Sequence, residues 1–101
     1  MPTKYSTEEA QQIIRDISCS PDGGFVPTWH AIEESGSARN FDAFDVLKVL
    51  RTGDVVSEPE YITKYRNWKC KMIGEDVEGE KLSLIVAFDP KRRRVYVITG
   101  W

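Results

Sequence analysis

The sequence predicts an α+β fold, because segments with helical patterning precede segments with strand patterning along the chain. The chain has 101 residues, of which 41% are hydrophobic and 30% are charged. This length and balance fit one globular domain, residues 1–101, with a single core. We therefore expect three N-terminal helices packed on one face of a three- to four-stranded antiparallel sheet, whose second face is free to form a site.

The first helix is predicted to start with a capping box, Ser6-Thr7-Glu8-Glu9, and to end near Ser18. Its apolar stripe has the helical spacing i, i+3, i+4 and i+7 and consists of Ala10, Ile13, Ile14 and Ile17. Residues 20–24 then read as a turn or loop on composition. We treat residues 1–27 as an N-terminal helix and loop that precede the core of the domain.

A second and a third helix are predicted in residues 28–53. Thr28 caps a short helix that Gly36 stops, and Asp42 caps a longer one that ends at Gly53. The apolar stripe of the longer helix is expected to be Ala43, Val46, Leu47 and Leu50.

Strands are predicted at 54–57, 61–73, 82–88 and 94–99, with turns at 74–79 and 89–93 between the last three. Within 61–73 the residue types alternate, with Trp68, Cys70 and Met72 on one face and Asn67, Lys69 and Lys71 on the other. If the first set faces the helices, Lys69 and Lys71 lie on the free face. Residues 82–88 are the most apolar and are expected to be central.

Charge is distributed unevenly along the chain. Residues 1–60 hold 5 Lys and Arg against 11 Asp and Glu, whereas residues 61–101 hold 9 against 5, so the strand half is basic within a net charge of −2. A domain polarised in this way can present a basic face to an anion. The other interpretation is that the helices happen to be acidic and the strands basic.

His30 is the only histidine and the natural candidate for proton transfer near neutral pH. In the first turn of a helix its cationic form is disfavoured, which suits a general base. The alternative is a partly buried structural histidine beside Trp29. Arg39, between the second and third helices, suits a phosphate contact or, alternatively, a surface ion pair with a nearby carboxylate.

Basic and aromatic residues alternate in 64–71, a mixture that suits an RNA strand, because phosphates bind cations and bases stack on rings. The cluster Lys91-Arg92-Arg93-Arg94 fits a turn that contacts phosphates. The alternatives are lysines that protect a strand edge and an ordinary solvated hairpin tip.

Several classes of function are disfavoured by the sequence. With one histidine and no close cysteine pair we expect no metal, and no motif indicates a cofactor. No apolar run is long enough for a membrane span, and the N-terminus lacks a signal core, so we expect a cytoplasmic protein without a membrane partner.

The ordered motifs Thr-x-His-Ala, Arg-x-apolar-Asp and Val-Leu-x-x-Gly-Asp-Val resemble those of a family of small uncharacterised bacterial domains. The resemblance covers residues 28–101, which we treat as a toxin-like core. It includes Tyr65, the hairpin 74–79 and the end of the last strand, Val97-Ile98-Thr99. That family looks like a relative of the RelE, BrnT and MqsR toxins, which implies a RelE/barnase-like fold.

The resemblance implies a metal-independent endoribonuclease (mRNA interferase) toxin, with RNA as substrate and a protein antitoxin encoded nearby. It places His30 and Arg39 at family positions and, more weakly, Tyr65. Lys69, Lys71, Arg92, Arg93 and Arg94 would bind RNA. Where the family often has an arginine, this chain has Glu34. The acidic pI of about 5.4 and Glu34 favour the alternative, a non-catalytic RNA- or protein-binding module, so whether the protein is an enzyme stays open.

Overall fold

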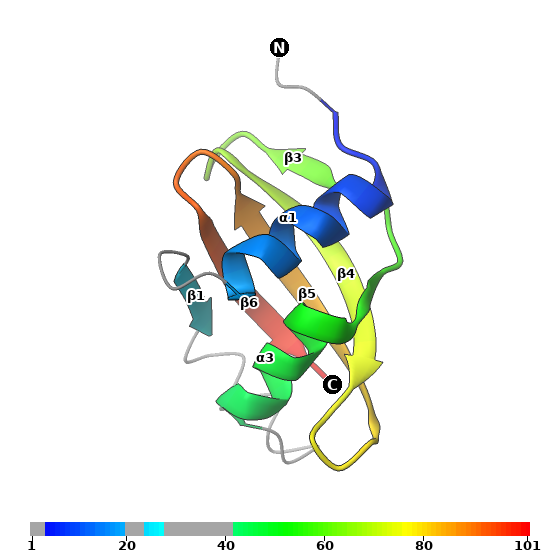
Figure 1. Cartoon of the computed structure of the whole chain (residues 1–101). Helices are drawn as coiled ribbons and strands as arrows, with labels where there is room; N and C mark the ends of the chain where they lie inside the picture. Colours follow the sequence, from blue (N-terminus) through cyan, green and yellow to red (C-terminus); the bar gives the residue numbers. More distant parts are fainter. Residues whose placement is uncertain (1–3, 20–23, 28–41) are drawn as a thin grey trace.

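The computed structural model describes residues 4–19, 24–27 and 42–101, and for 24–27 it describes the backbone alone. Two helices, α1 (Thr7–Cys19) and α3 (Ala43–Thr52), lie on one side of a sheet in this part of the chain (Figure 1). The strands are β1 (Gly24–Pro27), β2 (Asp54–Val55), β3 (Glu60–Ile62), β4 (Asn67–Glu75), β5 (Lys81–Asp89) and β6 (Arg94–Gly100).

Helix α1 begins with the predicted capping box. The backbone N–H of Ser6 donates to Glu9 Oε1 at 3.0 Å, and that of Glu9 donates to Ser6 Oγ at 3.1 Å. The predicted stripe is confirmed, because Ala10, Ile14 and Ile17 are buried and Ile13 packs partly buried against them. The Arg51 guanidinium donates to the Ser18 carbonyl at 3.1 and 3.2 Å, which fixes the end of α1 against α3.

Helix α3 has the predicted cap, because the Asp42 carboxylate accepts from the N–H groups of Phe44 and Asp45. It ends at Gly53 as expected. The buried face is shifted from the predicted one: Val46, Val49 and Leu50 are buried, whereas Ala43 is exposed and Leu47 half-buried. The spacing of apolar residues in this short helix allowed two overlapping stripes, and packing against the sheet selects the one that contains Val49.

The sheet has six strands in the described part of the chain, in the order β1-β6-β5-β4-β2, with β3 also paired to β4. Strands β2 to β6 pair antiparallel, and β1 joins β6 in parallel. Strand β5 lies in the middle of the order, as its apolar sequence predicted. Pro27 in β1 is tolerated because β1 is an edge strand.

The predicted arrangement of three helices on a sheet of three or four antiparallel strands was wrong. The described residues form two helices and a larger sheet with one parallel pair. The helix expected at 28–35 lies outside the described residues. Strand β1 was missed because four residues between glycine and proline carry too little pattern for a strand prediction. The fold remains α+β.

The strand predicted over 61–73 is two strands joined by a turn at 63–66. The N–H of Arg66 donates to the Ile62 carbonyl at 2.8 Å, and Arg66 itself has φ 55°. Such turns usually contain glycine or asparagine at the left-handed position, and this one uses arginine. The usual sequence signal for a hairpin is therefore absent here.

The core lies between the helices and the sheet. Trp68, Cys70 and Met72 of β4 point into it, which confirms the predicted alternation. Tyr5 packs edge-on against Trp68 and Phe88, with ring centroids 5.0 and 5.8 Å apart. The helices thus cover one face of the sheet, and the opposite face, which we call the open face, is formed on β4 by Asn67, Lys69 and Lys71.

Gly53 and Gly74 allow the end of α3 to lie directly against β4. A Cβ on Gly53 would stand 2.7 Å from the Val49 carbonyl oxygen and 2.8 Å from that of Ile73. Both neighbours are backbone atoms and cannot move aside without disturbing the helix or the sheet. At Gly74, a Cβ would lie 3.1 Å from the Cα of Gly53.

Gly53→Ala is therefore expected to lower the free energy of unfolding by about 1–3 kcal/mol, the usual cost of overpacking. Urea denaturation checks this, with the m-value unchanged. Thr52→Ala, one residue earlier on an exposed position, is the control and should change stability by less than about 0.5 kcal/mol. Equal stability of the two variants would contradict the close approach at Gly53.

The two cysteines are free and should differ in reactivity. Burial raises the pKa of the Cys70 thiol to about 12, so almost none of it is thiolate at pH 8. Cys19 is exposed at the end of α1. In the native protein a thiol reagent at pH 8 should modify one cysteine, and Cys19→Ser should abolish that reaction. Modification of both thiols at one rate without unfolding would contradict the burial of Cys70.

Candidate functional site

The open face combines apolar and basic side chains in rows set by strand register. Lys69 lies opposite Ala87, which lies opposite Tyr96, and Lys71 lies opposite Ile85. Side chains directly opposite in an antiparallel pair share a face. The rows therefore place the two lysines of β4 beside a mostly apolar floor supplied by β5 and β6.

A pocket of about 380 Å³ opens on this face, where β3, β4, β5 and β6 meet. Its lining residues are Ile62, Tyr65, Asn67, Lys69, Ala87 and Ile98. Lys69 is exposed, and Asn67, two residues earlier on the same face of β4, is buried. The pocket thus offers an ammonium group, a phenol and an amide around an apolar base, the set that suits an anion carrying a flat ring.

Two hairpin loops bring cations to the end of the sheet next to this pocket. Loop 63–66 joins β3 to β4, and loop 90–93 joins β5 to β6. Trp68 pairs with Phe88 and Asp89 with Arg94, so both loops lie at the same end (Figure 1). We call this the basic end; its cations are Lys64, Arg66, Lys91, Arg92, Arg93 and Arg94.

Asp89 orders the second of these loops without neutralising it. Its carboxylate accepts from the N–H groups of Lys91 and Arg92 at 3.1 and 3.2 Å. The ion pair with Arg92 Nε is long, 3.9 Å, and the Arg92 side chain is 70% exposed. Because the pair is long and its guanidinium is exposed to solvent, Arg92 remains available for an anionic partner although the Asp89 carboxylate is buried.

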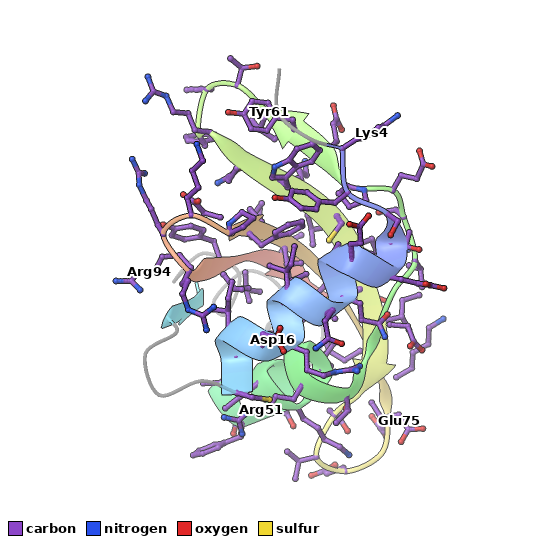
Figure 2. All side chains as sticks on the ribbon, turned by 45° about the horizontal axis from the view of Figure 1, so that its top comes forward. Lys4, Asp16, Arg51, Tyr61, Glu75 and Arg94 are labelled. Carbon is purple, nitrogen blue, oxygen red and sulfur yellow. The ribbon has the colours of Figure 1, made fainter. Side chains whose placement is uncertain are left out.

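Arg93 and Arg94 are also exposed, and Arg93 takes the left-handed conformation, φ 53°. Figure 2 shows Arg94 at one end of the sheet and Glu75 at the other. The hairpin at the far end, 75–80, is acidic, with Glu75, Asp76, Glu78 and Glu80. Charge is therefore separated along the strand direction, with cations at one end of the sheet and carboxylates at the other. The division of the sequence into an acidic and a basic half describes this arrangement only coarsely.

Two exposed aromatic rings on the open face, beside the half-buried Tyr96, each have a lysine against them. Tyr65 is 62% exposed, and Lys64 Nζ lies 5.3 Å from its ring centroid. Trp101 is 48% exposed, and Lys71 Nζ lies 5.1 Å from its ring centroid. Sequence reasoning singled out Tyr65 and missed Trp101.

The position of Trp101 depends on a bulge in β6. Val95 and Val97 face the core, and strict alternation would carry Thr99 and Trp101 to the core as well. The register shifts between Ile85 and Val86, so that Thr99 lies opposite Ile85 on the open face. No residue type in Val97-Ile98-Thr99 marks this bulge, so the sequence contained no signal for it.

A second cavity, of about 730 Å³, lies beside α3 and the acidic hairpin. Its charged lining residues are Lys48, Asp54, Glu75 and Lys81, so its charges balance. Lys48 Nζ already donates to the Asp76 carbonyl at 2.9 Å. The larger cavity therefore has no preference for an anion, and the open face is the better candidate site.

The residues predicted from the sequence are distributed as follows. Tyr65 and Lys69 share the pocket, Lys71 lies further along the same face, and Arg92, Arg93 and Arg94 lie at the basic end. His30 and Arg39 lie outside the described residues, so the structure gives neither their positions nor their distance from the pocket.

In residues 4–19, 24–27 and 42–101, no group of three His, Cys, Asp or Glu side chains is placed to hold a metal ion. Within the same ranges, neither helix has the length and apolar character needed to cross a bilayer.

Comparison with known proteins gives the family. A family model described as a domain of unknown function, DUF4258, matches residues 28–99, a stretch that includes α3, β2 to β5 and nearly all of β6. Helix α1 and strand β1 precede the matched stretch. No curated protein and no solved structure matches the chain. Because the match covers more than half of the sequence, the chain belongs to the DUF4258 family.

Proposed function

We propose that this protein is a metal-independent endoribonuclease, the toxin of a toxin–antitoxin pair, and that it binds single-stranded RNA on the open face. The observation that carries the proposal is the pocket of Tyr65, Asn67 and Lys69 directly beside the basic end. Phosphates would bind the cations while a base stacks on an exposed ring. A relationship to the RelE, BrnT and MqsR toxins is part of this proposal.

The proposed reaction needs only proton transfer and charge stabilisation. The ribose 2′-oxygen attacks the adjacent phosphorus, a base takes the 2′-hydroxyl proton, and an acid protonates the departing 5′-oxygen. The products are a 2′,3′-cyclic phosphate and a 5′-hydroxyl. Cations lower the energy of the phosphorane, on which negative charge accumulates.

His30 is proposed as the general base or acid, and Arg39 as the group that stabilises the charge on the scissile phosphate. Tyr65, together with Lys69 or Lys71, would bind or protonate the leaving side. Arg92, Arg93 and Arg94 would hold the flanking RNA. This division of labour follows the family resemblance for His30 and Arg39, and the geometry of the open face supports the other assignments.

A second candidate function is a non-catalytic RNA- or protein-binding module that uses the same face. One observation favours it: among the described residues that line the pocket there is no carboxylate and no histidine, so no general base of the usual kind stands there. Glu34, at a position where the family often has arginine, points the same way.

The proposal places the protein in the cytoplasm, where mRNA is found, and gives it a protein antitoxin encoded nearby. An acidic segment of that antitoxin would neutralise the basic end. Release from the antitoxin would then expose the open face to RNA.

RNA cleavage by the refolded, inhibitor-free protein tests the activity. We expect metal-independent cleavage in EDTA with 2′,3′-cyclic phosphate ends, a loss of about 10²–10⁴-fold in rate for His30→Ala, and a smaller loss for Lys69→Ala. Gel electrophoresis of a labelled oligonucleotide measures the cleavage rates, and mass spectrometry identifies the ends of the products.

Growth arrest after induction, relieved by His30→Ala, should accompany cleavage. Equal cleavage by the wild type and His30→Ala would remove His30 from the mechanism. RNA binding without turnover would identify the non-catalytic module. If the protein neither binds nor cleaves any RNA, both the endoribonuclease and the RNA-binding module are wrong for the open face, and only a protein-binding module is left.

The basic end should dominate the salt dependence of RNA binding. Arg92→Gln combined with Arg94→Gln should weaken binding and reduce the slope of log K against log salt concentration by about one for each lost phosphate contact. Lys4→Gln, just ahead of α1 on the helix side, removes one positive charge away from the basic end; as the control it should leave the slope unchanged. An unaltered slope in the double variant would place RNA away from this end.

A further inference from the structure

We propose that Trp101 is a second base-stacking site, so that the open face binds one continuous single strand between Tyr65 and Trp101. The proposal rests on the proposed RNA-binding function and adds to it a specific path, a length of RNA and a residue. Lys69 and Lys71 would contact phosphates between the two rings. The occupant is single-stranded RNA, because stacking on side chains requires bases that are not paired in a duplex.

The backbone holds Trp101 firmly at the edge of the face. The N–H of Trp101 donates to the Ser83 carbonyl at 2.9 Å, and the N–H of Ser83 donates to the Trp101 carbonyl at 2.9 Å. Ser83 is a partner of Ile73, so Trp101 lies in the row beyond Lys71. Because its backbone is already ordered, only the two side-chain torsions of Trp101 lose freedom when a base stacks on the ring of this 48% exposed residue.

The surface between the two rings fits a polyanion with flat bases. Ile98 is 38% exposed and shares the pocket with Tyr65 and Lys69. Lys71, beside Trp101, lies two residues further along β4 than Lys69. Successive contacts along the face are therefore aromatic, cationic, apolar, cationic and aromatic, as in proteins that bind a single strand through stacking and phosphate contacts.

The length of the path predicts the length of the RNA. From Asn67, next to Tyr65, to Ile73, in the row of Trp101, β4 rises about 20 Å at roughly 3.3 Å per residue. A stacked strand that rises 3.4 Å per nucleotide covers this distance in about six nucleotides. Affinity should therefore grow with oligonucleotide length up to about six and then level off, apart from contacts at the basic end.

A side-chain carboxylate on each of the neighbouring strands β2 and β3 lies beside the path. Glu60 lies directly opposite Lys69 on β3, and Asp54 lies opposite Ile73 on β2. Glu60 is exposed and would repel a phosphate bound by Lys69. Glu60→Gln should therefore raise RNA affinity, a gain that simple damage to the fold would not produce.

The experiment measures fluorescence anisotropy of labelled oligouridines of three to ten nucleotides, with every ribose 2′-O-methylated so that no 2′-hydroxyl is available for attack. Trp101→Leu removes the flat ring but keeps an apolar side chain, and Trp101→Phe keeps an aromatic ring. We expect a loss of about 5- to 100-fold for Trp101→Leu, a smaller loss for Trp101→Phe, and a gain for Glu60→Gln.

The length dependence separates stacking from a general weakening. The plateau in affinity should shift to shorter oligonucleotides in Trp101→Leu and stay in place in Arg92→Gln. Unfolding curves identify any variant that fails to fold. If Trp101→Leu fails to fold, two separate single variants test the same path: Lys71→Gln should weaken RNA binding and Glu60→Gln should strengthen it. Unchanged affinity in both would overturn the path.

Cleavage and binding by the wild type distinguish an error in the second stacking site from an error in the proposed function. If the wild type cleaves RNA while Trp101→Leu binds every length as well as the wild type, the second stacking site is wrong and the endoribonuclease stands. Tighter binding of a duplex than of a single strand would also overturn the second stacking site. If the wild type binds no oligonucleotide and cleaves no RNA, the proposed function itself fails.

Discussion

The packing of α1 and α3 on one face of the β4–β5–β6 sheet is the constraint on which the rest of the structure depends. Ile14, Val49 and Leu50 from the helices meet Met72, Leu84 and Val86 from the sheet, and these side chains are fully buried. Strand alternation then sends every intervening residue to the opposite face. One hydrophobic core thereby fixes both the stability of the domain and the composition of its open face, since Lys69 and Lys71 face outward because Trp68, Cys70 and Met72 face inward.

The ends of the open face depend on local departures from regular strands. Arg66 and Arg93 each take a left-handed conformation in a loop that reverses the chain, and both loops lie at the same end of the sheet. At the other end the bulge in β6 turns Trp101 away from the core side. A regular sheet with glycine turns would present fewer cations and would lack the exposed indole. The irregular positions thus add loop cations and an indole to the lysines that regular alternation places on this face.

The parts of the fold that follow periodicity were predictable from the sequence. The capping box at Ser6, the cap at Asp42, the stop at Gly53 and the alternation through Met72 are local patterns that the fold preserves. The turn at 63–66 is local but carries no glycine or asparagine signal, the edge strand β1 depends on pairing with a segment about 70 residues away, and the bulge at Ile98 appears only in the pairing of β5 with β6. Only some of the lining residues of the pocket could be predicted from the sequence. Tyr65 and Lys69 lie near each other in sequence, whereas Ala87 and Ile98 reach the pocket only through the register of the sheet. His30 and Arg39 rest on the resemblance alone.

The small negative net charge of the chain is compatible with binding a polyanion, because the charges are separated in space. A phosphate at the basic end would lie near Lys64 and Arg66 of one loop and the cations of residues 91–94 in the other loop at the same end of the sheet. The acidic hairpin 75–80 lies at the opposite end of β4 and β5, about 25–30 Å away along strands of nine residues at roughly 3.3 Å each. That separation is about three screening lengths at physiological ionic strength, so the hairpin weakens binding at the basic end very little. The carboxylates that matter are the near ones, Asp89, which orders the arginine loop, and Glu60, which opposes Lys69 directly. The charges that a polyanion would meet on the open face are therefore set by the local arrangement of side chains, and the total charge of the chain does not describe them.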